Sequence, residues 1–158
     1  MKKYLICLMA IVVIISTIGC GSAGLELTNE DYNLSDNTTS KGITIGSSSA
    51  DFMNAYDGFE VSVIYADSGN NVGTFMKIDK VDYSKQCTVA IQNFFVDDKS
   101  HTVDEIKNKY NIKNDINTWL QNNPDFLEKH SLTYKCLTFY FDNETVVDIK
   151  YSEKNFNE

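Results

Sequence analysis

The closing stretch of the chain restricts the fold more than any other feature. Residues 132–151, LTYKCLTFYFDNETVVDIKY, carry large apolar side chains at every second position on both sides of a polar turn. A period of two predicts two antiparallel strands with one buried and one exposed face. Pairing Phe139 with Ile149 and Leu137 with Tyr151 brings the large apolar residues to one face. The sequence therefore predicts a long hairpin that needs a sheet or helices to cover it.

The turn of this hairpin sets its register. If Phe141 pairs with Val147, the loop around residues 143–145 has three or five residues. A two-residue loop would instead turn Asp148 and Lys150 toward the core, and burying two charges is costly. We therefore expect the longer loop, with Val147 buried.

The other face of the hairpin carries Tyr134 and Tyr140, which this register leaves exposed. Tyrosines are common on exposed sheet faces, and they also anchor partners at protein interfaces. The final strand can also form an open sheet edge that accepts another strand. Tyr134 and Tyr140, together with Trp119 on a predicted helix, are the candidate partner-binding residues.

The region before the hairpin mixes helices and strands. It predicts, in order, a helix with a capping box at Ser48 and Asp51, strands over 59–65, 74–81 and 86–96, and short helices beginning at Thr102, at Asn114 or Asp115, and at Pro124. Three consecutive strands with short turns are typical of an antiparallel meander. We expect one α+β domain over residues 43–158, with an antiparallel sheet of about five strands and short helices packed on one face.

The N-terminus has the pattern of an export signal. Lys2 and Lys3 precede eleven uninterrupted apolar residues, 5–15, and small residues follow. This apolar run is shorter than the ~20 residues that a membrane-spanning helix needs. We therefore expect residues 1–19 to be a signal peptide that is removed from the mature protein.

The end of this signal, TIGC at residues 17–20, resembles the lipobox of bacterial lipoproteins. The resemblance implies that Cys20 becomes the N-terminus and carries a diacylglycerol, often with further acylation such as palmitate. Two or more acyl chains hold a protein stably on a membrane. The implied location is the extracytoplasmic face of the cell membrane, and the polar residues that follow, 20–42, predict a flexible tether.

A second resemblance concerns the domain. Residues 42–56, GITIGSSSADFMNAY, and the closing LTFYFDNETVVDIKY are similar to small envelope lipoprotein domains related to the outer-membrane assembly lipoprotein BamE and to beta-lactamase inhibitor protein. Those domains carry a G-x-S-x-x-D segment on a first helix and a terminal hairpin of this type. The resemblance implies a binding domain in the cell envelope. The Gly-Pro that often follows the first helix is missing here.

The charge balance excludes some partners. The formal net charge is −8 at pH 7, and removal of the signal would make the chain more acidic. Nucleic acid is not expected as a partner, because binding to phosphates needs a basic face. Broad docking on anionic lipid is disfavoured for the same reason, so membrane attachment depends on the lipid at Cys20.

Two cysteines, Cys87 and Cys136, remain in the domain. Cys87 alternates with buried positions, whereas Cys136 lies on the Tyr134 and Tyr140 face of its strand. Residues on opposite faces of one sheet cannot form a disulfide without backbone movement. The pattern favours two free thiols over a bridge.

No catalytic constellation is present in the sequence. His101 and His130 lie in polar turns, and no nucleophile elbow, phosphate loop or zinc-protease motif occurs. The acidic turns lack calcium-loop spacing, so we expect no metal and no cofactor.

We expect a non-enzymatic lipoprotein that binds another envelope protein. The alternatives are a small-ligand-binding lipoprotein with a pocket beside Trp119, and an envelope hydrolase that uses Cys87 and His130.

Overall fold

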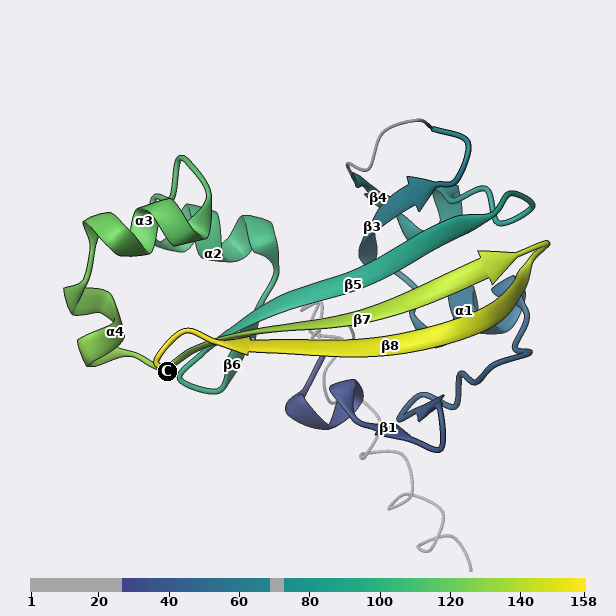
Figure 1. Ribbon diagram of the computed structural model, residues 1–158, viewed down its shortest axis with the longest axis horizontal. Helices are drawn as coiled ribbons and strands as arrows, with labels where there is room; N and C mark the ends of the chain where they lie inside the picture. The colour runs from purple at the N-terminus through teal and green to yellow at the C-terminus, as the bar shows by residue number, and fades with distance from the viewer. Residues whose placement is uncertain (1–26, 69–72) are drawn as a thin grey trace, which may run out of the picture.

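The computed structural model describes residues 27–68 and 73–158. The predicted signal peptide, residues 1–19, and the predicted lipidation site, Cys20, lie outside the described residues. Within the described part, a six-stranded antiparallel sheet combines with four α-helices and a separate two-stranded sheet (Figure 1). This confirms the α+β class and the antiparallel sheet.

The elements follow one another in the order in which the sequence predicted helices and strands, with several additions. They are η1 (Asn29–Tyr32), β1 (Leu34–Ser35), β2 (Thr38–Thr39), α1 (Ser49–Ala55), β3 (Glu60–Tyr65), β4 (Thr74–Lys77), η2 (Ile78–Lys80), β5 (Cys87–Val96), β6 (Lys99–His101), α2 (Val103–Lys109), α3 (Ile116–Asn122), α4 (Asp125–Lys129), β7 (Leu132–Asp142) and β8 (Thr145–Asn155). The predicted strand over residues 74–81 is only half extended, because η2 replaces its second half.

The sheet has the strand order β4-β3-β5-β7-β8, with short β6 paired to the end of β5. Long strands β5, β7 and β8 run side by side across the molecule, and β4 and β8 form the two edges (Figure 1).

Helices begin where the sequence supplies caps. The Thr102 hydroxyl accepts a hydrogen bond from Glu105 N–H, and Asp115 accepts one from Thr118 N–H. Both satisfy donors that a helix start otherwise leaves unpaired.

The turn between β7 and β8 differs from the prediction. It contains two residues, Asn143 and Glu144, and both have positive φ, 47° and 61°. Two-residue hairpin turns of this kind match the right-handed twist of the strands. The prediction of a three- or five-residue loop is therefore wrong.

A β-bulge removes the conflict that argued against the short turn. Val146 pairs with Phe141 and is buried, and the extra residue, Val147, is 48% exposed. Beyond the bulge Phe139 pairs with Ile149, as predicted, and both are buried. One inserted residue thus keeps the charges on the outer face. The prediction that Val147 is buried is wrong.

The two faces of the sheet have separate hydrophobic cores. The first face carries the odd-numbered residues of β5, and α1 covers part of it. Phe52 of α1 is fully buried, with its ring 4.6 Å from that of Phe139 and 5.1 Å from that of Phe141. Aromatic rings at such separations attract each other, and this attraction stabilises the fold in addition to the burial of their apolar surface. Phe52 therefore packs α1 onto the first face.

Residues 27–42 also pack on the first face. Leu27, Tyr32 and Thr39 are buried, and the Tyr32 hydroxyl donates a hydrogen bond to Asn93 Oδ1 at 2.9 Å. The predicted flexible tether over residues 20–42 is therefore wrong for residues 27–42, which belong to the domain. Apolar residues in this segment are few and have no helical or strand period, so the sequence pattern did not indicate burial.

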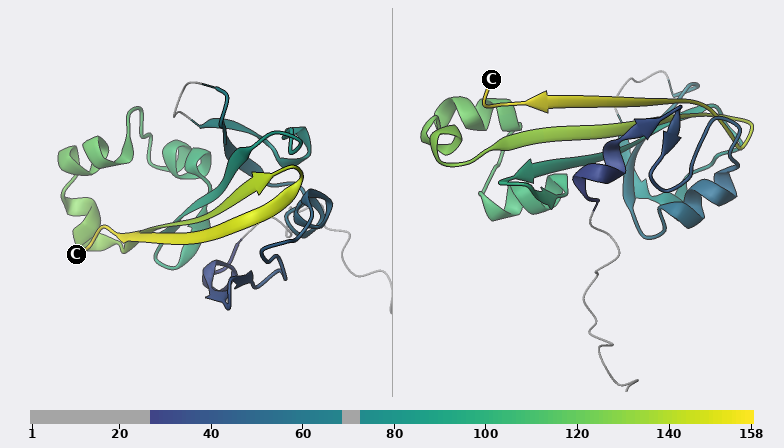
Figure 2. Two further views of the ribbon diagram at one scale, coloured as in Figure 1. Left: turned by 45° about the vertical axis from the view of Figure 1, so that its right-hand side comes forward. Right: turned by 90° about the horizontal axis from the view of Figure 1, so that it is seen from below.

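The second face carries the even-numbered residues of β5, because successive side chains of a strand point to opposite faces. Phe94 and Val96 belong to a second core with residues of α2 and α3, whereas Phe95 belongs to the first core. Helices α2, α3 and α4 gather at the far end from α1 (Figure 2). The helices thus lie on both faces, not on one face as expected from the sequence.

Candidate binding groove

Part of the second face has no helix over it. Here the side chains of β5 and their partners on β7 form an array that we call the open face: Thr88, Ala90, Gln92, Cys136, Thr138 and Tyr140. Except for Cys136, these residues are only partly buried. Helices α2 to α4 cover only the end of the second face, beyond Gln92.

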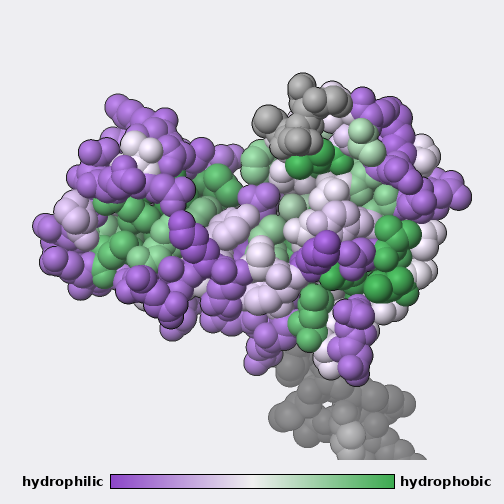
Figure 3. Space-filling model, viewed as in Figure 1, coloured by the Kyte–Doolittle hydropathy of each residue, from purple (hydrophilic) through white to green (hydrophobic). Residues whose placement is uncertain are grey.

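A groove lies where the open face meets the helices. Its first part, about 360 Å³, lies between the β3–β4 hairpin and the start of α2. The second part, also about 360 Å³, continues past α2 toward α3 and the end of β8. Both parts share Phe75, Gln92 and Val103, so they form one continuous groove. Figure 3 shows the surface hollowed between the helical end and the β3–β4 end.

Phe75 of β4 is the most exposed large apolar residue of the described chain, at 56%. Strand β4 holds it at the sheet edge, where it pairs with Ser62 of β3. Gly73 precedes it at a close approach, since a Cβ at this position would lie 2.0 Å from Ser62 Oγ. Glycine therefore allows β4 to lie against β3 and present Phe75 to the groove.

The rim of the groove carries both signs of charge. Glu60 and Lys77 occupy paired positions on β3 and β4, and Asp104 lies in the first turn of α2. Lys107 and Lys154 line the second part. An apolar floor with a mixed polar rim resembles the layout of protein-binding surfaces rather than a site for one ionic ligand.

Among the three residues predicted from the sequence, Tyr134 alone lines the groove. Its ring lies 5.1 Å from that of Phe94, and burial raises the pKa of its hydroxyl well above the usual value. Tyr134 is therefore a partly buried wall residue, and its neutral hydroxyl can donate or accept a hydrogen bond.

Tyr140 shares the open face but lies near the β7–β8 turn. The Lys150 ammonium lies 4.7 Å from its ring centroid, and hydrogen bonding to Asp148 raises the pKa of Lys150. The shallow hollow beside it includes Cys87 and Val147 and is separate from the groove. The structure does not bring Tyr140 together with Tyr134.

Trp119 lies on α3 in an aromatic cluster with Tyr110 and Phe126. The three ring centroids are 5.0 to 6.1 Å apart, so the rings pack against one another. A hollow of about 370 Å³ beside them is lined by His130 and several polar residues of α3 and α4. Trp119 therefore belongs to a different surface from the groove.

The sequence reasoning missed Phe75, Gln92 and Val103 as site residues. Phe75 fell within a predicted strand with no clear alternation, TFMKI, so its face could not be assigned. Val103 follows the predicted helix start at Thr102, and it is half-buried at the groove wall. The only sequence signal near Phe75 is Gly73, two positions earlier, because a glycine beside a strand indicates a close backbone approach.

Cys87 and His130 do not meet. Cys87 is the first residue of β5 and is buried on the first face, where burial raises the pKa of its thiol to about 11. His130 lies beyond the other end of β5, where its Nδ1 donates to Asp97 Oδ2 at 2.7 Å. Ten strand residues between them span roughly 30 Å. A nucleophile and its base must be within hydrogen-bond reach, so this pair has no catalytic geometry.

Cys87 and Cys136 are both free, as the alternation predicted. Cys87 pairs with Phe141, and Cys136 pairs with Gln92 on the opposite face. Their side chains point away from each other across the sheet.

The described residues span 27–68 and 73–158. Within these ranges, no group of three or more His, Cys, Asp or Glu side chains could hold a metal ion. None of the helices there has both the length and the apolar character that crossing a bilayer requires.

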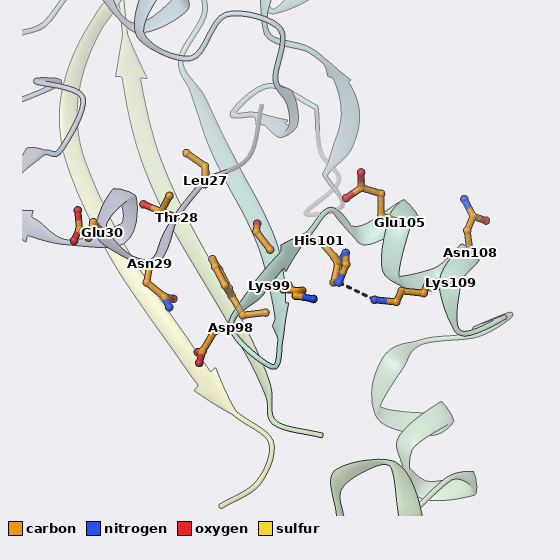
Figure 4. A pocket seen from close by; sticks show the side chains of 12 residues that line it. Leu27, Thr28, Asn29, Glu30, Asp98, Lys99, His101, Glu105, Asn108 and Lys109 are labelled. Carbon is orange, nitrogen blue, oxygen red and sulfur yellow. Dashed lines mark hydrogen bonds between the residues drawn. The ribbon is translucent and has the colours of Figure 1, made fainter. Parts of the chain in front are cut away.

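A larger hollow, about 1120 Å³, lies between η1 and the β6–α2 region (Figure 4). Lys109 Nζ lies 3.3 Å from His101 Nε2, and Glu105 and Lys99 line the same space. Both signs of charge alternate around it. It therefore defines no single ligand chemistry, and the groove is the better candidate site.

Comparisons of the chain with protein-family models, with curated proteins and with solved structures found no match.

Proposed function

We propose that this protein is a membrane-anchored lipoprotein whose extracytoplasmic domain binds another envelope protein through the groove, without catalysis. The observation that carries the proposal is Phe75, a large apolar side chain that is 56% exposed at the groove. Burying a phenylalanine side chain fully is worth about 2–3 kcal/mol. A partner that covers Phe75 gains much of this free energy, which is the property of an interface anchor.

The groove suits a protein segment with one or two apolar side chains. Each part has a volume of about 360 Å³, enough for a few side chains. Gln92 in the floor supplies a hydrogen-bonding amide, and charges of both signs at the rim can pair with polar residues of a partner. These features favour a protein partner over a small ligand, which needs a deeper, more enclosed site.

The anchor half of the proposal rests on Cys20 and the lipobox-like TIGC sequence. A chain with a formal net charge of −8 at pH 7 has little attraction to anionic lipid, so acyl chains at Cys20 supply the attachment. We expect Cys20→Ala to release the protein from membranes and to abolish fatty-acid labelling, measured by fractionation and metabolic labelling. Cys136→Ala is the matched control and stays attached. Unchanged membrane attachment of Cys20→Ala would refute the anchor.

The binding half is tested by photo-crosslinking in cells. A photoreactive amino acid at Phe75 is expected to capture a specific envelope protein. Val147 provides the control position, because it is 48% exposed on the same sheet but lies near the β7–β8 turn, away from the groove. Equal capture at both positions, or none at Phe75, contradicts a binding site in the groove.

A matched pair of substitutions then tests the energetics. Phe75→Ser is expected to reduce binding of the captured partner by about tenfold to a hundredfold, the usual effect of truncating an interface anchor. Val147→Ser removes a similarly exposed apolar side chain and is expected to leave binding unchanged. If a metabolite shifts the fluorescence of Trp119 and no protein is captured, the small-ligand alternative replaces this proposal.

A further inference from the structure

The outer edge of β8 is the longest open strand edge of the described chain. Strand β8 ends the sheet, and β7 pairs with only one of its sides. On the other side, Val146 N–H donates to Ser47 O, and Gly46 N–H donates to Val146 O. From Val147 to Asn155 no described element lies beside this outer edge, and the N-terminal segment stays on one face of the sheet (Figure 2).

Backbone alternation shows which groups point outward. Phe156 N–H donates to Leu132 O on β7, so every second residue before Phe156 also bonds to β7. The residues between them, Ile149, Tyr151 and Glu153, direct their N–H and C=O groups away from the sheet. Such groups form a template for a further strand.

We propose that β8 pairs antiparallel with β8 of a second copy of this chain, about a twofold axis at Tyr151, so that two sheets become one. Charge complementarity selects this partner and this register. With Tyr151 at the centre, Asp148 of each copy lies opposite Lys154 of the other, and Lys150 lies opposite Ser152. Opposite charges in directly paired positions stabilise a sheet.

The other twofold registers bring like charges together or meet an obstacle. A centre at Lys150 or Glu153 places that residue opposite itself, and a centre at Ser152 places Lys150 opposite Lys154. A centre at Ile149 would require the second copy to displace the 46–49 segment from Val146. Like charges in paired positions are destabilising, so the register at Tyr151 is preferred.

Asp148 holds a different position in the single copy. Its Oδ1 accepts a hydrogen bond from Ile149 N–H at 2.9 Å, and its Oδ2 lies 3.4 Å from Lys150 Nζ. The side chain thus covers one outward N–H and protects the edge. In the pair, the second copy's backbone takes over this N–H and Asp148 turns to Lys154. Pairing is therefore reversible and depends on the local concentration of copies, which a shared membrane raises.

Disulfide trapping in membranes tests the pairing with the full-length chain. Cysteines at position 151 of two copies would have Cα atoms about 5.5 Å apart, within disulfide range. We expect Tyr151→Cys to give a crosslinked dimer upon mild oxidation. Glu153→Cys is the matched control, because the register separates its two copies by roughly 13 Å along the strands. Equal yields at 151 and 153, or a crosslink from 151 to a different protein, would overturn the proposal.

Charge reversal then tests the register in the Tyr151→Cys background. Asp148→Lys and Lys154→Asp are each expected to lower the dimer yield by about tenfold, since each places two like-charge pairs in the dimer. Combining both reversals restores the opposite charges and is expected to restore the yield. Single reversals that leave the yield unchanged, or a double variant that stays as low as the singles, refute this register. The urea midpoint of each variant shows that the fold is retained.

Discussion

Two buried tyrosines allow a sharp test of the packing on the first face. Tyr32 and Tyr56 are both fully buried, at 0% exposure, but only the Tyr32 hydroxyl donates a hydrogen bond, to Asn93 Oδ1 at 2.9 Å. The Tyr56 hydroxyl has no hydrogen-bond partner among the described residues. The same substitution, tyrosine to phenylalanine, is therefore expected to have opposite effects at the two positions.

The expected magnitudes follow from these contacts. Tyr32→Phe leaves the Asn93 carbonyl buried without its donor, which costs about 1–3 kcal/mol in the free energy of unfolding. Tyr56→Phe removes an unpaired hydroxyl from an apolar site and is expected to stabilise the protein by up to about 1 kcal/mol. Burial raises the pKa of Tyr56 to about 12, although the side chain of Thr39 opposes the rise.

Urea unfolding followed by far-UV circular dichroism measures both effects. With a slope of about 2 kcal/mol per molar urea, Tyr32→Phe is expected to lower the midpoint by about 0.5–1.5 M. Tyr56→Phe keeps the midpoint or raises it. If Tyr32→Phe has no effect, residues 27–42 are not packed as described. If Tyr56→Phe costs as much as Tyr32→Phe, the Tyr56 hydroxyl is bonded and Thr39 is its partner.

Three further predictions concern other parts of the sheet. Val146→Ala is expected to lower the free energy of unfolding by about 2 kcal/mol, because Val146 is buried at the bulge. Val147→Ala is expected to change the free energy of unfolding by less than about 0.5 kcal/mol, because Val147 is exposed. Urea titration measures both effects. The Cys87 thiol is expected to resist alkylation in the native protein at pH 8 and to react once urea unfolds it, as mass spectrometry would show; fast native labelling contradicts its burial. The hydrogen bond from His130 lowers the pKa of Asp97, so this carboxylate stabilises the fold above the ordinary aspartate pKa, and its contribution disappears as the pH falls through the lowered value. Asp97→Asn is therefore expected to lower the urea midpoint at pH 7 and to leave it unchanged near pH 2; equal losses at both values refute the interpretation.

The hairpin shows what the sequence pattern can predict and where the prediction fails. Alternation correctly paired Phe139 with Ile149, and it placed Cys87 and Cys136 on opposite faces. It failed at the turn, because a bulge at Val147 changes the period by one residue. A bulge leaves no mark in a pattern that counts only apolar and polar residues.

The candidate groove could not be predicted from the sequence, for a related reason. Tyr134 was predicted to be exposed, and it lines the groove, but nothing in the sequence joins it to Phe75. These residues meet because β3 pairs with β5 and carries β4 on its other side, while α2 folds over the other end of β5. Neither the strand order nor the choice of face for a helix follows from local periodicity.

The sequence by itself determined the local structure: the alternation that predicts the strands, the helix caps at Ser48 and Thr102, and the opposite strand faces of Cys87 and Cys136. These depend on residues a few positions apart, so they can be recognised in the chain. The tertiary structure alone decided the packing of residues 27–42, the helices on both faces and the groove. Tyr32 is buried because it contacts Asn93, which lies 61 positions away, and contacts at that separation are set by the whole fold.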